Sequence, residues 1–89
     1  MLLENILIKR VGEVRRGVSN ATGNSWANRD VLLEMEDETG KSYISAIVDE
    51  GVWSQMNHHE GDTVSLNLRF RTQVRSSNFV VNDIRIVKS

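Results

Sequence analysis

The sequence of 89 residues contains no cysteine and no proline. Without cysteine the chain cannot form a disulfide or a thiolate metal site, so a hydrophobic core alone must hold the fold. No segment resembles a signal peptide, and no apolar run approaches the roughly 20 residues that span a bilayer. We therefore expect a single cytoplasmic domain, residues 1–89, that does not engage a membrane.

Catalytic motifs are also missing. The sequence has no phosphate-cradling glycine loop and no nucleophile motif. His58 and His59 are the only pair that suggests a metal, and no third ligand follows at a recognisable spacing. The sequence therefore predicts no enzyme, no cofactor and no metal site, and it favours a binding or assembly module.

Positive and negative side chains are nearly balanced in number. Eleven lysines and arginines against twelve acids give a net charge of −1, whereas nucleic-acid binders are usually basic. The charges are nevertheless segregated along the chain. Nine cations lie at Lys9, Arg10, Arg15, Arg16, Arg69, Arg71, Arg75, Arg85 and Lys88. A basic side would form if the first, fourth and fifth predicted strands lie together, although ordinary solubilising charges explain the same counts equally well.

The stretch from Trp26 to Val48 alternates apolar and polar residues, which is the period of a half-buried strand. The alternation breaks at residues 37–41, where Gly40 suits a turn position with positive φ. This stretch therefore predicts two strands joined by a tight turn. The inward residues are Val31, Leu33, Met35, Ile44, Ala46 and Val48. We expect the outer face, which carries Trp26 and Tyr43, to be where a partner binds.

The remaining segments predict three more strands and one short helix. Residues 6–14 read as a first strand bent at Gly12, and the polar residues 17–25 read as a loop. Residues 49–59 have helical spacing, with Asp49 as N-cap and Trp53 pointing into the core. Residues 63–71 form the cleanest strand, whose inward face ends at Phe70. A polar loop at 72–78 then leads to a last strand at 79–87.

This order of elements is that of an all-β, five-stranded OB-fold Greek-key barrel with one short helix between strands 3 and 4. The chain also resembles a small bacterial family of OB-fold proteins that are similar to single-stranded DNA-binding proteins. The resemblance covers nearly the whole chain. It rests on Gly17-Val18-Ser19 through Asn24-Ser25-Trp26, on Glu60-Gly61-Asp62-Thr63-Val64, and on Asn82-Asp83-Ile84-Arg85.

The resemblance implies a binding surface across the second and third strands, between the loops at 17–25 and 72–78. The expected ligand is single-stranded nucleic acid, DNA in particular, bound weakly and with little regard to sequence. Such a ligand needs aromatic faces for its bases and cations along its backbone. The candidates are Trp26, Tyr43 and Phe79 for stacking, and Arg16, Arg69, Arg71 and Arg75 for phosphate contacts. Trp26 fits a plug at the end of the barrel equally well.

The alternative is a protein-interaction module that does not bind nucleic acid. Small OB domains can assemble through strand edges or exposed sheet faces. Phe79, Val81, Leu32 and Ile47 supply a candidate apolar surface. We expect a homo-oligomer in either case, because assembly would also enlarge a weak binding surface.

Overall fold

The computed structural model describes residues 1–76 and 79–89, without the side chains of residues 73, 75, 76 and 81. This part of the chain forms six strand segments and one helix. They are β1 (Leu2–Val11), β2 (Arg15–Val18), β3 (Ser25–Asp37), β4 (Gly40–Asp49), α1 (Glu50–Met56), β5 (Thr63–Ser76) and β6 (Phe79–Lys88).

The predicted first strand at residues 6–14 is interrupted at its bend: β1 ends at Val11, and β2 begins only at Arg15, beyond the predicted range. Both pair antiparallel with β3, so that Val11 faces Val31 and Arg15 faces Asn28. Between them the Gly12 N–H donates to the carbonyl oxygen of Asp30 at 2.8 Å. A Cβ at Gly12 would lie 2.9 Å from that oxygen, so only glycine lets the chain bend while it stays this close to β3.

The sheet closes into a barrel. Its strand order is β1-β5-β6-β4-β3-β2, and an additional pairing of β1 with β3 closes the circle. The strands β4 and β6 run parallel, with Ile47 opposite Arg85, whereas the other pairs are antiparallel. With β1 and β2 counted as one bent strand, this is a five-stranded barrel with the OB-fold order, which confirms the predicted fold class. The first, fourth and fifth predicted strands lie side by side as β1, β5 and β6.

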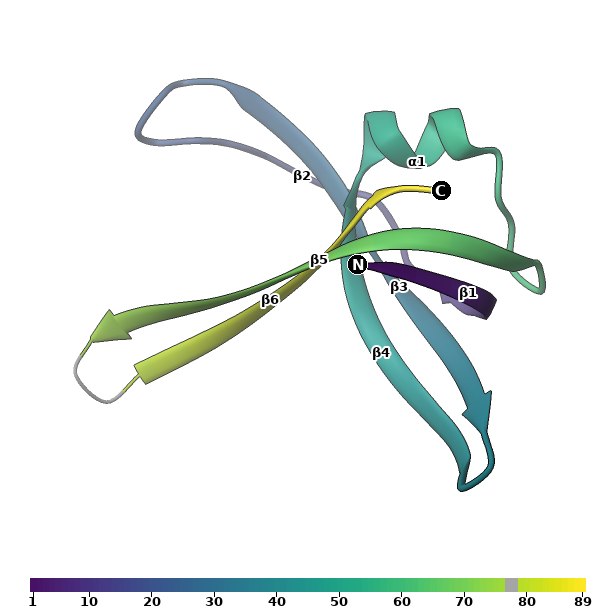
Figure 1. Cartoon of the computed structure of the whole chain (residues 1–89). Helices are drawn as coiled ribbons and strands as arrows, with labels where there is room; N and C mark the ends of the chain where they lie inside the picture. Colours follow the sequence, from purple (N-terminus) through teal and green to yellow (C-terminus); the bar gives the residue numbers. More distant parts are fainter. Residues whose placement is uncertain (77–78) are drawn as a thin grey trace.

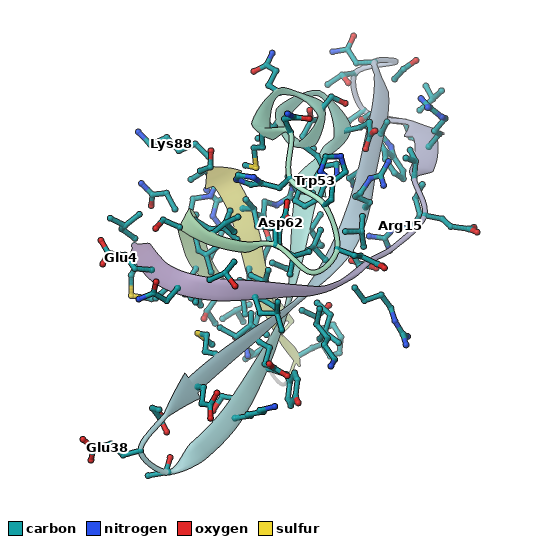
Figure 2. All side chains as sticks on the ribbon, turned by 90° about the vertical axis from the view of Figure 1, so that its right-hand side faces the viewer. Glu4, Arg15, Glu38, Trp53, Asp62 and Lys88 are labelled. Atoms are coloured by element: carbon teal, nitrogen blue, oxygen red, sulfur yellow. The ribbon has the colours of Figure 1, made fainter. Side chains whose placement is uncertain are left out.

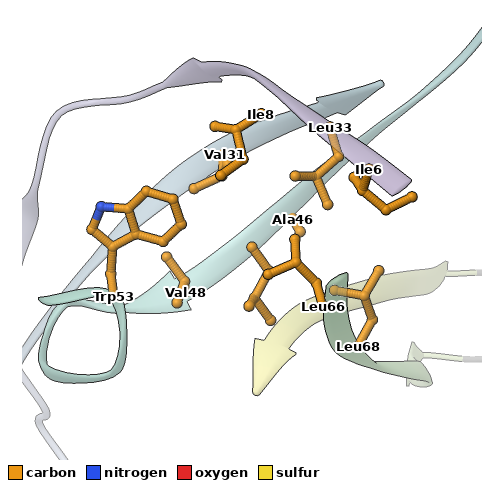
Figure 3. Close-up of a cluster of buried hydrophobic side chains, with 10 residues drawn as sticks. Ile6, Ile8, Val31, Leu33, Ala46, Val48, Trp53, Leu66 and Leu68 are labelled. Carbon is orange, nitrogen blue, oxygen red and sulfur yellow. The ribbon is translucent and has the colours of Figure 1, made fainter. Parts of the chain in front are cut away.

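The core lies between the inward faces of these strands (Figure 3). Alternation along each strand fills it with aliphatic side chains, and Trp53 of α1 closes one end. Each such side chain contributes about 1.5–3 kcal/mol when fully buried. The buried residues are Ile6, Ile8, Val31, Leu33, Ala46, Val48, Trp53, Leu66, Leu68 and Ile86. The predicted inward positions Val31, Leu33, Ala46, Val48 and Trp53 are therefore confirmed, although Met35 and Ile44 are only half-buried.

The helix α1 is fixed at its start by a cap and by an ion pair. The Asp49 carboxylate accepts hydrogen bonds from the N–H groups of Gly51 and Val52 at 2.9 and 3.3 Å, which confirms the predicted N-cap. The Arg29 guanidinium of β3 donates to both carboxylate oxygens of Glu50, at 2.7 and 2.9 Å. This two-point contact holds the helix against β3.

Three hairpins project beyond the barrel (Figure 1). We name them the β2–β3 arm (residues 15–28), the β3–β4 arm (residues 34–43) and the β5–β6 arm (residues 70–84). The radius of gyration of 14.4 Å exceeds the roughly 12 Å expected for a compact domain of this length. The arms therefore make the molecule more extended than a compact barrel of the same length.

The β5–β6 arm overturns two predictions. The segment predicted as a loop at residues 72–78 is mostly strand, since β5 continues to Ser76 and β6 begins at Phe79. Phe70 was expected inside, but its side chain is 46% exposed. Both errors have one cause. A two-stranded ribbon outside the barrel has solvent on both faces, so it needs no apolar alternation and its inward side meets no core.

The loop predicted at residues 17–25 is shorter than expected. Gly17 and Val18 belong to β2 and pair with Trp26 and Ser25 at the start of β3. The connection is residues 19–24, in which the Ser19 N–H donates to the Asn24 carbonyl oxygen at 2.9 Å and the Gly23 N–H donates to the Ser19 carbonyl oxygen at 2.8 Å. Trp26 therefore lies in the two-stranded ribbon, directly opposite Gly17.

Candidate nucleic-acid interface

The β2–β3 arm presents Trp26 as a partly exposed aromatic side chain. Trp26 lies directly opposite Gly17 in the antiparallel register, and the indole is 44% exposed. A Cβ built on Gly17 would come within 2.4 Å of the indole Cζ2 atom and 2.7 Å of Cε2. The ring therefore lies against the backbone of Gly17, where any larger residue would place a side chain. It does not plug the barrel, whose end is closed by Trp53.

Trp26 helps to line an open pocket of about 480 Å³. Its lining residues come from both strands of the arm and are Arg16, Gly17, Val18, Ser25, Trp26 and Ala27. Arg16 has no ion-pair partner within 4 Å among the described residues. Its neighbour Arg15, in contrast, pairs with Asp30 at 3.0 Å. The structure thus brings together one predicted stacking residue and one predicted phosphate contact.

The outward face of the barrel links this arm to the β5–β6 arm. Cross-strand neighbours form a row from β3 to β5 through Asp30, Ile47, Arg85 and Arg69. Trp26 precedes Asp30 by four residues, and Arg71 follows Arg69 by two. Given about 3.3 Å per residue and about 4.8 Å between strands, the diagonal from Trp26 to Arg71 is roughly 25 Å. Both arms project to the left of the barrel in Figure 1.

Arg69 and Arg71 are exposed on this outward face, as predicted. Neither forms an ion pair within the described residues, whereas Arg85 donates to Asp83 at 2.9 Å. Arg69 faces Arg85 and Arg71 faces Asp83 in the β5–β6 register. Arg69 and Arg71 are therefore available to a ligand, while Arg85 is partly neutralised by its acidic neighbour.

The β5–β6 arm also carries exposed apolar side chains. Phe79, a predicted stacking residue, is 58% exposed at the start of β6. Phe70, Val74 and Val80 are exposed on the same arm. A pocket of about 190 Å³ lies beside Phe70, lined in addition by Thr72 and Asn82. The side chain of Arg75, a predicted phosphate contact, lies outside the described ones.

Tyr43 lies elsewhere, on the β3–β4 arm. It is 53% exposed, and in the register it faces Glu34, eight residues along β3 from Trp26. Eight residues of strand separate the two aromatic positions by roughly 26 Å. A hydrogen bond to Glu34, together with desolvation and the charge of that carboxylate, raises the pKa of the Tyr43 phenol. The structure therefore does not join Tyr43 and Trp26 in one stacking surface.

The end of the β3–β4 arm is acidic. Figure 2 places Glu38 at its tip, on the side of the molecule away from Arg15. The turn is held by Asp37, whose carboxylate accepts from the N–H and hydroxyl of Thr39 at 2.8 and 2.6 Å. These hydrogen bonds lower the pKa of Asp37. The carboxylate is therefore ionised at neutral pH, and the arm repels a phosphate backbone.

Sequence reasoning missed Gly17 and Phe70 as parts of this surface, and it did not pair Ile47 with Arg85. Gly17 was assigned to a loop, yet the identity of its partner across the strand appears only once β2 is paired. Phe70 continues the inward alternation of β5, so nothing in the sequence marks where the barrel ends. Ile47 and Arg85 become neighbours only through the parallel pairing of β4 with β6. Alternation alone could at best have placed Ile47 and Arg85 on outward faces.

Other kinds of site are not formed by the described residues. Among them no three His, Cys, Asp or Glu side chains lie close enough to hold a metal ion. Arg29 donates hydrogen bonds to Glu50 and to the carbonyl oxygen of Gly12, so its guanidinium is already engaged within the protein. In the described part of the chain, no helix has both the length and the apolar character needed to cross a bilayer.

Comparisons with known protein families, with curated proteins and with solved structures found no match for this chain. The resemblance to OB-fold proteins similar to single-stranded DNA-binding proteins therefore stays a prediction. What the molecule does must be inferred from its own surface.

Proposed function

We propose that this protein binds single-stranded nucleic acid, DNA in particular, with little regard to sequence. The ligand lies along the outward face between the β2–β3 arm and the β5–β6 arm. The observation that carries the proposal is the partly exposed indole of Trp26, set in an open pocket beside an unpaired arginine. In this proposal the protein binds its ligand and does not catalyse a reaction.

Stacking supplies the first part of the binding energy. A large aromatic face that is open to solvent on a soluble protein is available to another planar group. Stacking of a base on such a face contributes roughly 1–3 kcal/mol and suits all four bases, because each has a π-face. Trp26 on one arm and Phe79 on the other are the exposed aromatic candidates. Few stacked bases imply modest affinity.

Arginine contacts supply the second part. Arg16, Arg69 and Arg71 are exposed, and the described residues offer them no ion pair. Acidic residues gather at the far end of the β3–β4 arm, so a net charge of −1 does not exclude a locally basic path. With about three phosphates neutralised, log affinity should fall with log salt at a slope of roughly −2.

Fluorescence titration with oligo-dT tests this function. The chain has two tryptophans, of which Trp53 is only 7% exposed, so a ligand-dependent change should come from Trp26. We expect quenching at low salt, and affinity that falls roughly 20-fold between about 50 and about 200 mM salt. Absence of any response at low salt would rule the proposal out.

Two double variants test whether oligo-dT binds at the arginines of the outward face. Arg69→Ala combined with Arg71→Ala should weaken binding and reduce the salt slope from roughly −2 to roughly −0.7. A matched control replaces Lys9 and Lys88 by alanine, which removes the same charge away from the row. Anisotropy of a labelled oligo-dT gives both affinities. Equal losses in the two pairs would mean that only overall charge matters.

Self-association is a second candidate function, favoured by the exposed apolar side chains of the β5–β6 arm. Phe70, Val74, Phe79 and Val80 are each more than two-fifths exposed on one ribbon. Exposed apolar groups that gather in this way are typical of protein contacts. Sedimentation should then give a homo-oligomer that Val74→Ser with Val80→Ser dissociates. If those substitutions leave the mass unchanged, the arm is not the contact.

A further inference from the structure

We propose that Gly17 positions Trp26 as a platform for one unpaired base, with the neighbouring phosphate on Arg16. The inference deepens the proposed function and rests on it. It adds Gly17, which has no side chain, to the residues that shape the binding site. It also states which class of group the pocket on the β2–β3 arm accepts.

The geometry of the pair is the starting point. Residues directly opposite in an antiparallel ribbon place their side chains on the same face. Gly17 leaves that place empty, and the indole of Trp26 fills it. A Cβ at Gly17 would be 2.4 Å from Cζ2, 2.7 Å from Cε2 and 3.1 Å from Nε1. Any other residue at position 17 would therefore move the ring off the ribbon.

A ring held in this way is ready to bind. Trp26 lies on a two-stranded ribbon outside the barrel, where a free side chain would sample several rotamers. Contact with the ribbon limits those rotamers before the ligand arrives, so less conformational entropy is lost on binding. The 44% of the side chain that remains exposed is the part that a base can cover.

The pocket accepts an unpaired base by its face. Stacking uses the π-face, which all four bases share, so the pocket does not select a sequence. Bases inside a duplex are already stacked on both sides, so double-stranded DNA does not supply a free face. Arg16 also lines this pocket, but alternation along β2 starts its side chain on the opposite face of the ribbon, so it would reach the adjoining phosphate around the free edge of β2. The ligand class is a nucleotide within a single strand.

A structural role for the pair makes a different prediction. An aromatic side chain packed over a cross-strand glycine stabilises a ribbon without any ligand. In that case Gly17→Ala would change stability, and its effect on oligonucleotide binding would not depend on the ring at position 26. Gly17 is not in the left-handed region, so alanine introduces no backbone strain there.

A double-mutant cycle separates the two roles. Wild type, Gly17→Ala, Trp26→Phe and the double variant are titrated with a labelled oligo-dT at low salt, and each is melted alone. Gly17→Ala should weaken binding roughly tenfold in the wild-type chain. In the Trp26→Phe chain, whose smaller ring reaches less far over position 17, the same change should weaken it less than about twofold. Gly51→Ala, a glycine replacement in α1, is the control and should leave affinity unchanged.

The outcomes distinguish this inference from the proposed function. If wild type does not bind at low salt, the proposed function fails. If wild type binds and Gly17→Ala binds equally well, only the positioning role is wrong. Equal losses in both chains would show that Gly17 acts through the ribbon and would also overturn the inference. Near-ultraviolet circular dichroism of the free proteins gives an independent readout, since Gly17→Ala should change the Trp26 signal before any ligand is added.

Discussion

Two arms of this molecule each expose an aromatic side chain, yet their surroundings differ. On the β2–β3 arm, Trp26 lies over Gly17 beside Arg16. On the β3–β4 arm, Tyr43 faces the buried carboxylate of Glu34 and lies close to the acidic turn. Exposure is similar in the two cases, at 44% and 53%. The charge next to the ring, rather than the ring itself, therefore separates a candidate base platform from an ordinary sheet contact.

The largest expected difference comes from removing the two rings. Trp26→Ala should weaken binding of oligo-dT by roughly 5- to 150-fold, which corresponds to about 1–3 kcal/mol of stacking. Tyr43→Ala should change the affinity less than about twofold, because phosphate is repelled near Glu34 and Glu36. Labelled oligo-dT anisotropy at low salt measures both. Similar losses in the two variants would contradict the comparison.

Stability provides the control for that experiment. Both rings lie outside the core, so each alanine variant should melt close to wild type. Leu33→Ala, at a position with no exposed surface, should instead lower the free energy of unfolding by about 2–5 kcal/mol. Thermal melting by circular dichroism measures all three. A Trp26→Ala chain as unstable as Leu33→Ala would mean that weak binding reflects unfolding.

A smaller effect should come from the cations of the two arms. Arg16→Ala removes one phosphate contact and should reduce the salt slope by about 0.7, with a loss of a few-fold in affinity at low salt. Lys41→Ala, at the turn of the β3–β4 arm, should leave the slope unchanged. Titrations at several salt concentrations give the two slopes. If Lys41→Ala reduces the salt slope as much as Arg16→Ala does, the path of the ligand includes the β3–β4 arm.

The negative charge at the end of the β3–β4 arm can also be removed. Glu36→Gln with Glu38→Gln removes two negative charges from its end and should strengthen binding about twofold at low salt. The gain should disappear at higher salt, because exposed charges farther apart than the Debye length of about 10 Å are then screened. A gain that persists at high salt would indicate a direct contact with the ligand.

The smallest change concerns the Tyr43 phenol, the only tyrosine in the chain. Its raised pKa means that the folded state holds the phenolic proton more tightly than the unfolded chain. The Glu34–Tyr43 contact thus contributes fully below the ordinary pKa of about 10, and its contribution is lost as pH rises through the raised value. Glu34→Gln should shift the phenolate absorbance titration to lower pH, whereas Glu36→Gln should shift it less. If Glu34→Gln leaves the titration unchanged, Glu34 does not act on the Tyr43 phenol.

The sequence alone determined the barrel. Alternation along the strands named the inward residues, Gly12 marked the bend, and Asp49 marked the start of α1, because burial and capping act over a few neighbouring positions. Sequence also placed Arg69 and Arg71 on an exposed face, but it left Trp26 open between a ligand platform and a plug at the end of the barrel. It assigned Phe70 to the core, since the point at which a strand leaves a barrel depends on how far its partners extend.

Only the tertiary structure decided how the exposed residues are grouped. Pairing of β2 with β3 placed Trp26 on Gly17, and the pairing of β4 with β6 joined Ile47 to Arg85 across the outward face. The same register separated Tyr43 from Trp26 by eight residues of strand. These contacts join positions far apart in the chain, and alternation fixes the face of a side chain but not its neighbour across the sheet.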